Sequence, residues 1–135
     1  MNGRRALASL TGIQSRLIVI GGCNQDSLKS VENYSMHSNK WNELPQINTA
    51  RGWAGSVLLS EKQVFCFGGA NFPSNILDSI ETLNLVQDGE WREMALDFKL
   101  SPTYQAAGAE FKNRIALFGG SLNACSPMFI MSKEG

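Results

Sequence analysis

The sequence lacks any long apolar run. No stretch approaches the about 18 consecutive apolar residues that a membrane-spanning helix needs. Residues 1–16 contain an apolar segment that is too short and too broken for a signal peptide. We therefore expect a soluble, cytoplasmic protein with no membrane partner.

The chain also lacks a surplus of either charge. Lysine and arginine together number 12, and so do aspartate and glutamate, so the formal net charge is zero. Proteins that bind nucleic acid through its phosphates usually present a basic surplus. We expect no nucleic acid partner. The 43% hydrophobic and 18% charged residues are instead typical of a globular chain with a core.

Cysteine and histidine are scarce, which argues against metal and thiol chemistry. Cys23, Cys66 and Cys125 lie 43 and 59 residues apart, without the paired CxxC spacing of zinc or thiol-exchange sites. We expect free thiols. The single histidine, His37, stands in the turn before Asn39 and is expected to be an exposed turn residue. No metal or cofactor is predicted.

The sequence does contain a repeated phrase. A short apolar run ends in a double glycine, a polar loop follows, and in the first two copies a Ser-(Val/Ile)-Glu strand and then a tryptophan come next. The first glycines are 47 and 51 residues apart, so a repeat architecture is indicated. The repeated residues, which we expect to be structural, are Gly21, Gly22, Glu32, Tyr34, Trp41, Gly68, Gly69, Glu81, Trp91, Gly119 and Gly120.

Short runs of apolar or alternating residues, separated by turn residues, predict an all-β fold. The expected strands are 7–10, 17–20, 31–36 and 41–44 in the first unit, 55–59, 64–67, 80–86 and 91–95 in the second, and 105–111, 115–118 and 128–131 in the third, whose fourth strand is missing. The double glycines should allow positive φ and close backbone approach. Trp41 and Trp91 are expected to be buried anchors on outer strands.

This order of GG, Glu, aromatic or apolar residue and Trp resembles the kelch repeat, most closely in residues 30–41. The resemblance covers two repeats and part of a third, and departs where Leu83 replaces Tyr34. It implies an architecture like that of galactose-oxidase-type propellers: a partial, open β-propeller of about two and a half to three four-stranded antiparallel blades. The expected single repeat region, residues 1–135, divides into blades near 1–47, 48–98 and 99–135.

Propellers close with about four to eight blades, so this chain alone is expected to leave an open β edge. Three explanations stay open: a fragment of a longer propeller protein, self-association of copies through the open edge, and a short open array. Enzymes of kelch type exist, and galactose oxidase binds copper through two tyrosines and two histidines. One histidine and two tyrosines cannot supply that set, so we expect no catalysis.

In a propeller the variable loops, rather than the repeated strands, carry binding. Two loop classes differ between units and, by the resemblance, face one rim of the channel. Counting back from the double glycines makes Arg51 equivalent to Arg4, which favours a structural role, and Trp53 equivalent to Ala6. The candidate protein-binding residues are Asn24, Gln25, Asp26, Arg51, Trp53, Asn71, Phe72, Ser74, Asn75 and Tyr104.

The predicted function is a non-catalytic scaffold for protein–protein interaction, with an unidentified protein partner. One alternative is the substrate-recognition part of a ubiquitin-ligase adaptor, which would require a BTB or F-box segment that these residues do not resemble. The other is a remnant of an enzymatic or carbohydrate-binding propeller.

Overall fold

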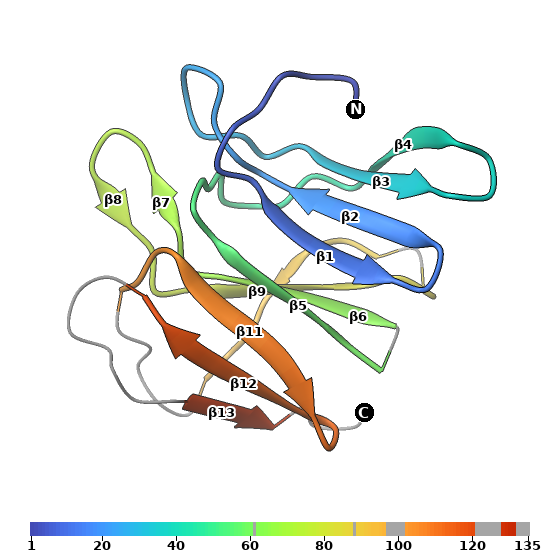
Figure 1. Cartoon of the computed structure of the whole chain (residues 1–135). Coiled ribbons are helices and arrows are strands. Elements are labelled where there is room, and N and C mark those ends of the chain that lie inside the picture. The colour runs from blue at the N-terminus through green and yellow to red at the C-terminus, as the bar shows by residue number, and fades with distance from the viewer. Residues whose placement is uncertain (61, 88, 97–101, 121–127, 132–135) are drawn as a thin grey trace.

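The described residues form three larger antiparallel sheets that lie side by side and one two-stranded hairpin (Figure 1). A computed structural model describes residues 1–60, 62–87, 89–96, 102–120 and 128–131. The first sheet, blade 1, has the order β1-β2-β3-β4. Its strands are β1 (Ser9–Ile13), β2 (Arg16–Ile20), β3 (Val31–Ser35) and β4 (Lys40–Leu44).

Blade 2 has the order β10-β9-β6-β5, and blade 3 has the order β11-β12-β13. The strands of blade 2 are β5 (Gly55–Leu59), β6 (Gln63–Phe67), β9 (Ile80–Asn84) and β10 (Arg92–Glu93). Those of blade 3 are β11 (Ala106–Phe111), β12 (Arg114–Gly119) and β13 (Met128–Met131). The described part of the chain contains no helix, so the predicted all-β, open and partial blade architecture is confirmed.

The observed strands differ from the predicted ones mainly at their ends. In blade 2, β9 ends at Asn84 rather than at residue 86, and β10 covers only Arg92–Glu93 rather than 91–95. Two further differences concern the loops. Strand β1 begins at Ser9 rather than Leu7, because Leu7 has a φ of 56°, which an extended strand cannot accommodate. The loop predicted after the second double glycine contains a small hairpin of its own, formed by β7 (Ala70–Asn71) and β8 (Asn75–Ile76). Both differences lie at the ends of the blades, where the candidate binding loops are.

The double glycines let the segment that leads into the next blade pass close to the strand end. Gly21 and Gly68 have φ values of 59° and 60°. A Cβ atom at Gly21 would lie 2.2 Å from the Arg51 carbonyl oxygen, and one at Gly68 would lie 2.3 Å from that of Thr103. The predicted positive φ and close approach are therefore confirmed, and no residue with a side chain fits there.

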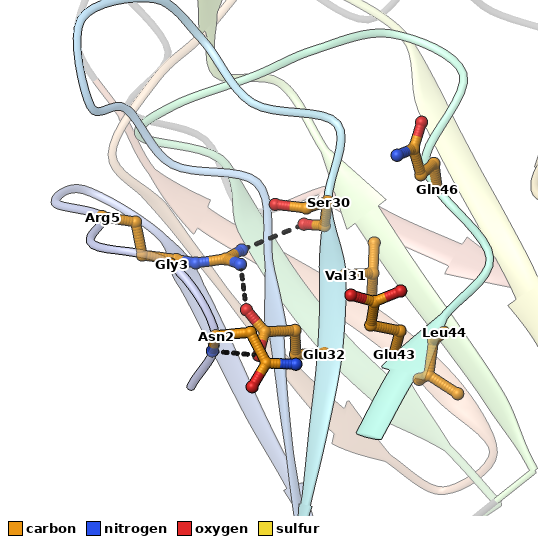
Figure 2. A pocket seen from close by; sticks show the side chains of 9 residues that line it. All are labelled: Asn2, Gly3, Arg5, Ser30, Val31, Glu32, Glu43, Leu44 and Gln46. Atoms are coloured by element: carbon orange, nitrogen blue, oxygen red, sulfur yellow. Dashed lines mark hydrogen bonds and ion pairs between the residues drawn. The ribbon is translucent and has the colours of Figure 1, made fainter. Parts of the chain in front are cut away.

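A buried ion pair follows each of the first two double glycines. In blade 2, Arg51 Nη1 donates to the Gly68 carbonyl at 2.9 Å and Nη2 donates to Glu81 Oε1 at 2.7 Å. In blade 1, Arg5 makes the same contacts with the Gly21 carbonyl and with Glu32. Figure 2 shows the contact with Glu32. The expected structural role of the repeated glutamates is thus an ion pair that joins the strands to the incoming segment.

The predicted equivalence of Arg4 with Arg51 is wrong by one residue, because Arg5 makes the pair. The hairpin turns explain the shift. Ile13 pairs with Arg16, which leaves residues 14 and 15 in the turn of blade 1. In blade 2, Leu59 pairs with Gln63, so the connection between these two strands is one residue longer. Counting back from the glycines therefore shifts every residue before the turn by one.

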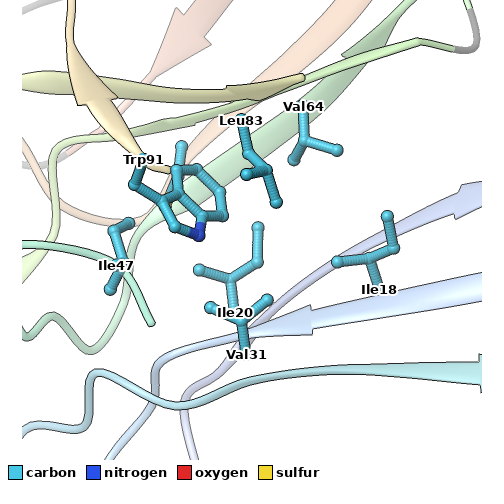
Figure 3. Close-up of a cluster of buried hydrophobic side chains, with 8 residues drawn as sticks. Ile18, Ile20, Val31, Ile47, Val64, Leu83 and Trp91 are labelled. Atoms are coloured by element: carbon cyan, nitrogen blue, oxygen red, sulfur yellow. The ribbon is translucent and has the colours of Figure 1, made fainter. Parts of the chain in front are cut away.

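Two hydrophobic clusters lie between the blades. One joins blades 1 and 2 and includes Ile20, Val31, Leu83 and Trp91 (Figure 3). The other joins blades 2 and 3 and includes Phe65, Phe67, Ile80, Ile115 and Leu117. Because apolar side chains contribute mainly by leaving water, the blades stabilise one another through these faces.

The two tryptophans expected on outer strands have different environments. Trp41 lies in β4, whereas Trp91 stands just before β10. Trp91 is 3% exposed in the cluster between blades 1 and 2, and its Nε1 donates to the Pro45 carbonyl at 2.8 Å. Trp41 is only half-buried and packs on Tyr34, with ring centroids 5.2 Å apart. The prediction of a buried anchor is right for Trp91 and wrong for Trp41, because Trp41 lies on the face of blade 1 that points away from blade 2.

Candidate functional site

The candidate binding surface is the rim, which we define as the loops after the first two double glycines together with the segments that lead into β5 and β11. Figure 1 shows the loop between β2 and β3 and the β7–β8 hairpin on the same side of the molecule, opposite the β1–β2 and β3–β4 turns. Loops of one rim are therefore contributed by different blades, as the resemblance implied.

Three aromatic side chains meet at the rim, and we call them the aromatic cluster: Trp53, Phe72 and Tyr104. The Trp53 and Phe72 rings are 4.9 Å apart and nearly perpendicular, at 68°. The Trp53 and Tyr104 rings are 5.7 Å apart, at 33°. All three side chains are half-buried. Their separations are those of favourable edge and offset aromatic pairs, so the cluster is a packed but accessible surface.

The backbone holds Trp53 in the centre of the cluster. Its N–H donates to the Leu7 carbonyl at 2.9 Å, and its carbonyl accepts from the Gln105 N–H at 2.8 Å. All three residues have positive φ, at 56°, 53° and 60°. They occupy the same place in the three blades, so the counterpart of Trp53 is Leu7 and the predicted Ala6 is wrong, for the turn-length reason given above.

The same register places Tyr104 where blade 2 has Gly52. Gly52 exchanges backbone hydrogen bonds with Ala70, and a Cβ atom on it would lie 2.3 Å from Cys23 Sγ. Thr103 takes the place of Arg51, and its buried Oγ1 has no hydrogen-bond partner among the described residues. Trp53 of blade 2 and Tyr104 of blade 3 therefore occupy different positions of the repeat. The repeat pattern alone does not predict that these two aromatic side chains meet.

Ser27 joins the loop of blade 1 to the hairpin of blade 2. Its Oγ donates to the Ala70 carbonyl at 3.1 Å and accepts from the Phe72 N–H at 2.9 Å. The loop that carries Asn24, Gln25 and Asp26 is thereby held beside the aromatic cluster. This link was not among the predicted site residues, since a serine in a polar loop carries no signal of its partner.

The remaining predicted rim residues surround the cluster with small polar groups. Asn24, Gln25 and Asp26 are exposed, and Asn24 Oδ1 accepts from the Gln25 N–H at 2.7 Å. Ser74 and Asn75 are exposed at the hairpin, while Asn71 is half-buried. No described contact joins Ser74 or Asn75 to the three rings. The rim therefore combines aromatic faces with amide and hydroxyl groups and carries a single acidic side chain among the predicted residues.

Arg51 does not belong to this surface. Its side chain is 0% exposed and is occupied by Glu81, the Gly68 carbonyl and Ser79. The prediction that it contributes to a binding face is wrong, because a partner cannot reach the guanidinium. The structural role favoured for it by the repeat is the one the structure shows.

The other chemically reactive groups lie apart from the rim or are buried. His37 is exposed in the β3–β4 turn, as predicted. Burial raises the pKa of the Cys66 thiol to about 12. Cys23 and Cys66 are free, as expected, while Cys125 lies outside the described residues. Within the described ranges there is no cluster of three or more metal-ligating side chains, and no helix with the length and apolarity of a membrane crossing.

The comparison with known families agrees with this geometry. Residues 4–48 match the family model described as the Kelch motif. The match begins beside Arg5 and runs through the whole of blade 1, so it includes the double glycine, Glu32 and Trp41. The first blade therefore carries a kelch motif, as its sequence pattern indicated.

Proposed function

We propose that this chain is a protein-interaction module whose contact surface is the rim. Kelch propellers commonly serve this purpose, which makes a protein partner the expectation for a chain with a kelch repeat. The observation that carries the proposal is the aromatic cluster, in which Trp53, Phe72 and Tyr104 come from three separate segments of two blades.

The composition of the rim supports a protein rather than a small charged ligand. Tryptophan and tyrosine are enriched among the residues that dominate binding free energy at protein interfaces. The surrounding asparagine, glutamine and serine side chains can donate and accept hydrogen bonds with a peptide backbone. A central aromatic patch with a polar border has the organisation of an interface core and its rim.

We further propose that the module is not catalytic. Glu32 and Glu81, the repeated carboxylates, each form an ion pair with an arginine and accept backbone hydrogen bonds. His37 stands in the β3–β4 turn, on the side of the molecule opposite the aromatic cluster. These placements favour structural and solvent-exposed roles over a converging set of acids and bases.

A quantitative pull-down with the immobilised 135-residue chain tests the interaction proposal. Trp53→Ala and Asn71→Ala should each reduce the recovery of specific partners at least tenfold. Val86→Ala is the matched control, because Val86 is a large exposed apolar residue beyond the end of β9 and outside the rim. Circular dichroism of every variant checks that the fold is retained. Full recovery of the same partners by the two rim variants would refute the proposal.

A further inference from the structure

Neighbouring blades meet through two kinds of face. Blade 2 turns side chains of β6 and β9, together with Trp91, towards blade 1 (Figure 3). Blade 3 repeats this arrangement, because Ile115 and Leu117 of β12 pack on Phe65 and Phe67 of β6. Each blade therefore has a leading face, which covers the preceding blade, and a trailing face, which the following blade covers.

Blade 1 has a leading face that no described blade covers. In the sheet pairing, Leu17, Val19, Tyr34 and Trp41 take the places of the blade 2 residues Val64, Cys66, Leu83 and Trp91, which pack on blade 1. Leu10, which pairs with Val19, takes the place of Ser56, whose Oγ accepts from Ser9 of blade 1. Leu10 is 60% exposed and Leu17, Tyr34 and Trp41 are half-buried, while Val19 is 8% exposed. We define this leading face as Leu10, Leu17, Val19, Tyr34 and Trp41.

Blade 3 has an uncovered trailing face. The side chains that alternate with Ile115 and Leu117 point away from blade 2, and they pair with matching positions of β11. Phe111 and Phe118 are 59% and 46% exposed, which is unusual for phenylalanine. We define this trailing face as Ala107, Ala109, Phe111, Ala116 and Phe118. Ala116, on the central strand, is 3% exposed, and the other four are exposed.

The glycine at the end of β12 gives independent support. Gly21 and Gly68 are positioned to take the backbone of a following blade within 2.3 Å of an added Cβ. Gly119 has the same type of conformation, with a φ of 70°, but no described residue comes within 4 Å of a Cβ built there. The end of blade 3 is therefore shaped to receive the incoming segment of another blade.

We propose that the leading face of one copy of this chain binds the trailing face of a second copy. Both faces are apolar, and each corresponds to a face that is already packed against its partner between blades 1, 2 and 3, with Leu10 standing where blade 2 has Ser56. Apolar patches of this kind mark interaction surfaces on soluble proteins.

Two copies related by a twofold axis make both contacts at once. Each copy contributes three blades, so the pair has six, which lies within the range of about four to eight at which propellers close. The contact differs from the pairing of open strand edges, because it is made by the side chains on the sheet faces and not by backbone hydrogen bonds. Substitutions of side chains on the faces should therefore weaken face-to-face dimerisation but not dimerisation through paired strand edges.

Sedimentation velocity and light scattering of the purified chain, over a range of concentrations, test the proposal. The unmodified chain should be a dimer. Leu10→Asp, on the leading face, and Phe118→Asp, on the trailing face, should each weaken dimerisation at least tenfold. Val86→Asp, which adds the same charge at an exposed residue outside both faces, should leave the dimer intact. Circular dichroism shows whether each variant is folded.

The most direct test mixes the Leu10→Asp chain with the Phe118→Asp chain. The Leu10→Asp chain keeps an intact trailing face and the Phe118→Asp chain keeps an intact leading face, so their mixture should form a heterodimer with one restored contact. A monomeric unmodified chain would overturn the proposal, as would a dimer insensitive to both substitutions or a mixture that stays monomeric. Assemblies larger than a dimer would contradict the closed six-blade pair.

Discussion

Arg51 and Glu81 form an ion pair, with Nη2 and Oε1 2.7 Å apart, in which both side chains are removed from water. The carboxylate also accepts from the N–H groups of Asn48 and Thr49 at 2.9 Å. These two residues belong to the segment that connects blade 1 to blade 2. The pair therefore holds the segment that connects blades 1 and 2 against strand β9, which carries Glu81.

Arg51→Met should be strongly destabilising. Removal of one partner leaves the Glu81 carboxylate buried without its counter-charge, which typically costs about 3 to 5 kcal/mol. Urea denaturation followed by tryptophan fluorescence measures the free energy of unfolding. The double variant Arg51→Met/Glu81→Met should lose less than the sum of the two single variants, because the residues act as one unit. Additive losses would contradict a coupled pair.

Substitution of Arg5 and of its neighbour Arg4 tests which of the two arginines pairs with Glu32. Arg5→Met should destabilise the chain by a few kcal/mol, because Arg5 pairs with Glu32 and contacts the Gly21 carbonyl. Arg4 is exposed, so Arg4→Met should change the free energy of unfolding by no more than about 0.5 kcal/mol. The same urea titration compares the two. Equal effects would mean that the register assigned to blade 1 is wrong.

Trp41 and Trp91 should differ in their importance for stability. Trp91→Ala removes a buried indole from the cluster between blades 1 and 2 and should cost about 3 to 5 kcal/mol. Trp41→Ala removes a half-buried ring and should cost clearly less in the monomeric chain. Thermal melting at low protein concentration, where self-association is minimal, provides the comparison. A larger loss for Trp41 would contradict the observed burial.

Cys66 should be inert to alkylation in the folded chain. Burial, with a further contribution from the Glu81 charge, raises the pKa of this thiol to about 12, although Arg51 acts in the opposite direction. The thiol therefore stays protonated at pH 8.5, and the thiolate that attacks the reagent does not form. Peptide mapping after iodoacetamide treatment should find Cys66 unmodified in buffer and modified in urea. Similar labelling in both would contradict its burial.

Much of the strand and turn arrangement could be predicted because the same residue pattern occurs in both of the first two blades. The double glycines carry the positive φ that only glycine adopts easily, and their spacing locates the strands before them. Glu32 and Glu81 stand out by recurring, and each forms an ion pair with an arginine. A residue that recurs in each repeat is usually needed for the fold of that repeat. The pattern of recurring residues therefore predicts the blades without knowledge of the side-chain contacts.

The errors come from features that a repeat cannot encode. One extra residue in the β5–β6 turn shifted the equivalence of Arg51 and Trp53 with blade 1. The burial of Trp41 depends on what covers its face, and the local pattern is the same as for Trp91. The contact among Trp53, Phe72 and Tyr104 depends on how separate loops pack. These residues could be predicted from the sequence as candidate binding residues, but their contact with one another could not.

The central claim is that partners bind at the rim, and hydroxyl-radical footprinting of the chain with and without a captured partner tests it most directly. The account predicts that Trp53, Phe72 and Tyr104 become protected from oxidation on binding, while Met36 and Val86, which are exposed away from the rim, react equally in both states. Protection of Met36 and Val86, with the three rim aromatics still reactive, would contradict it.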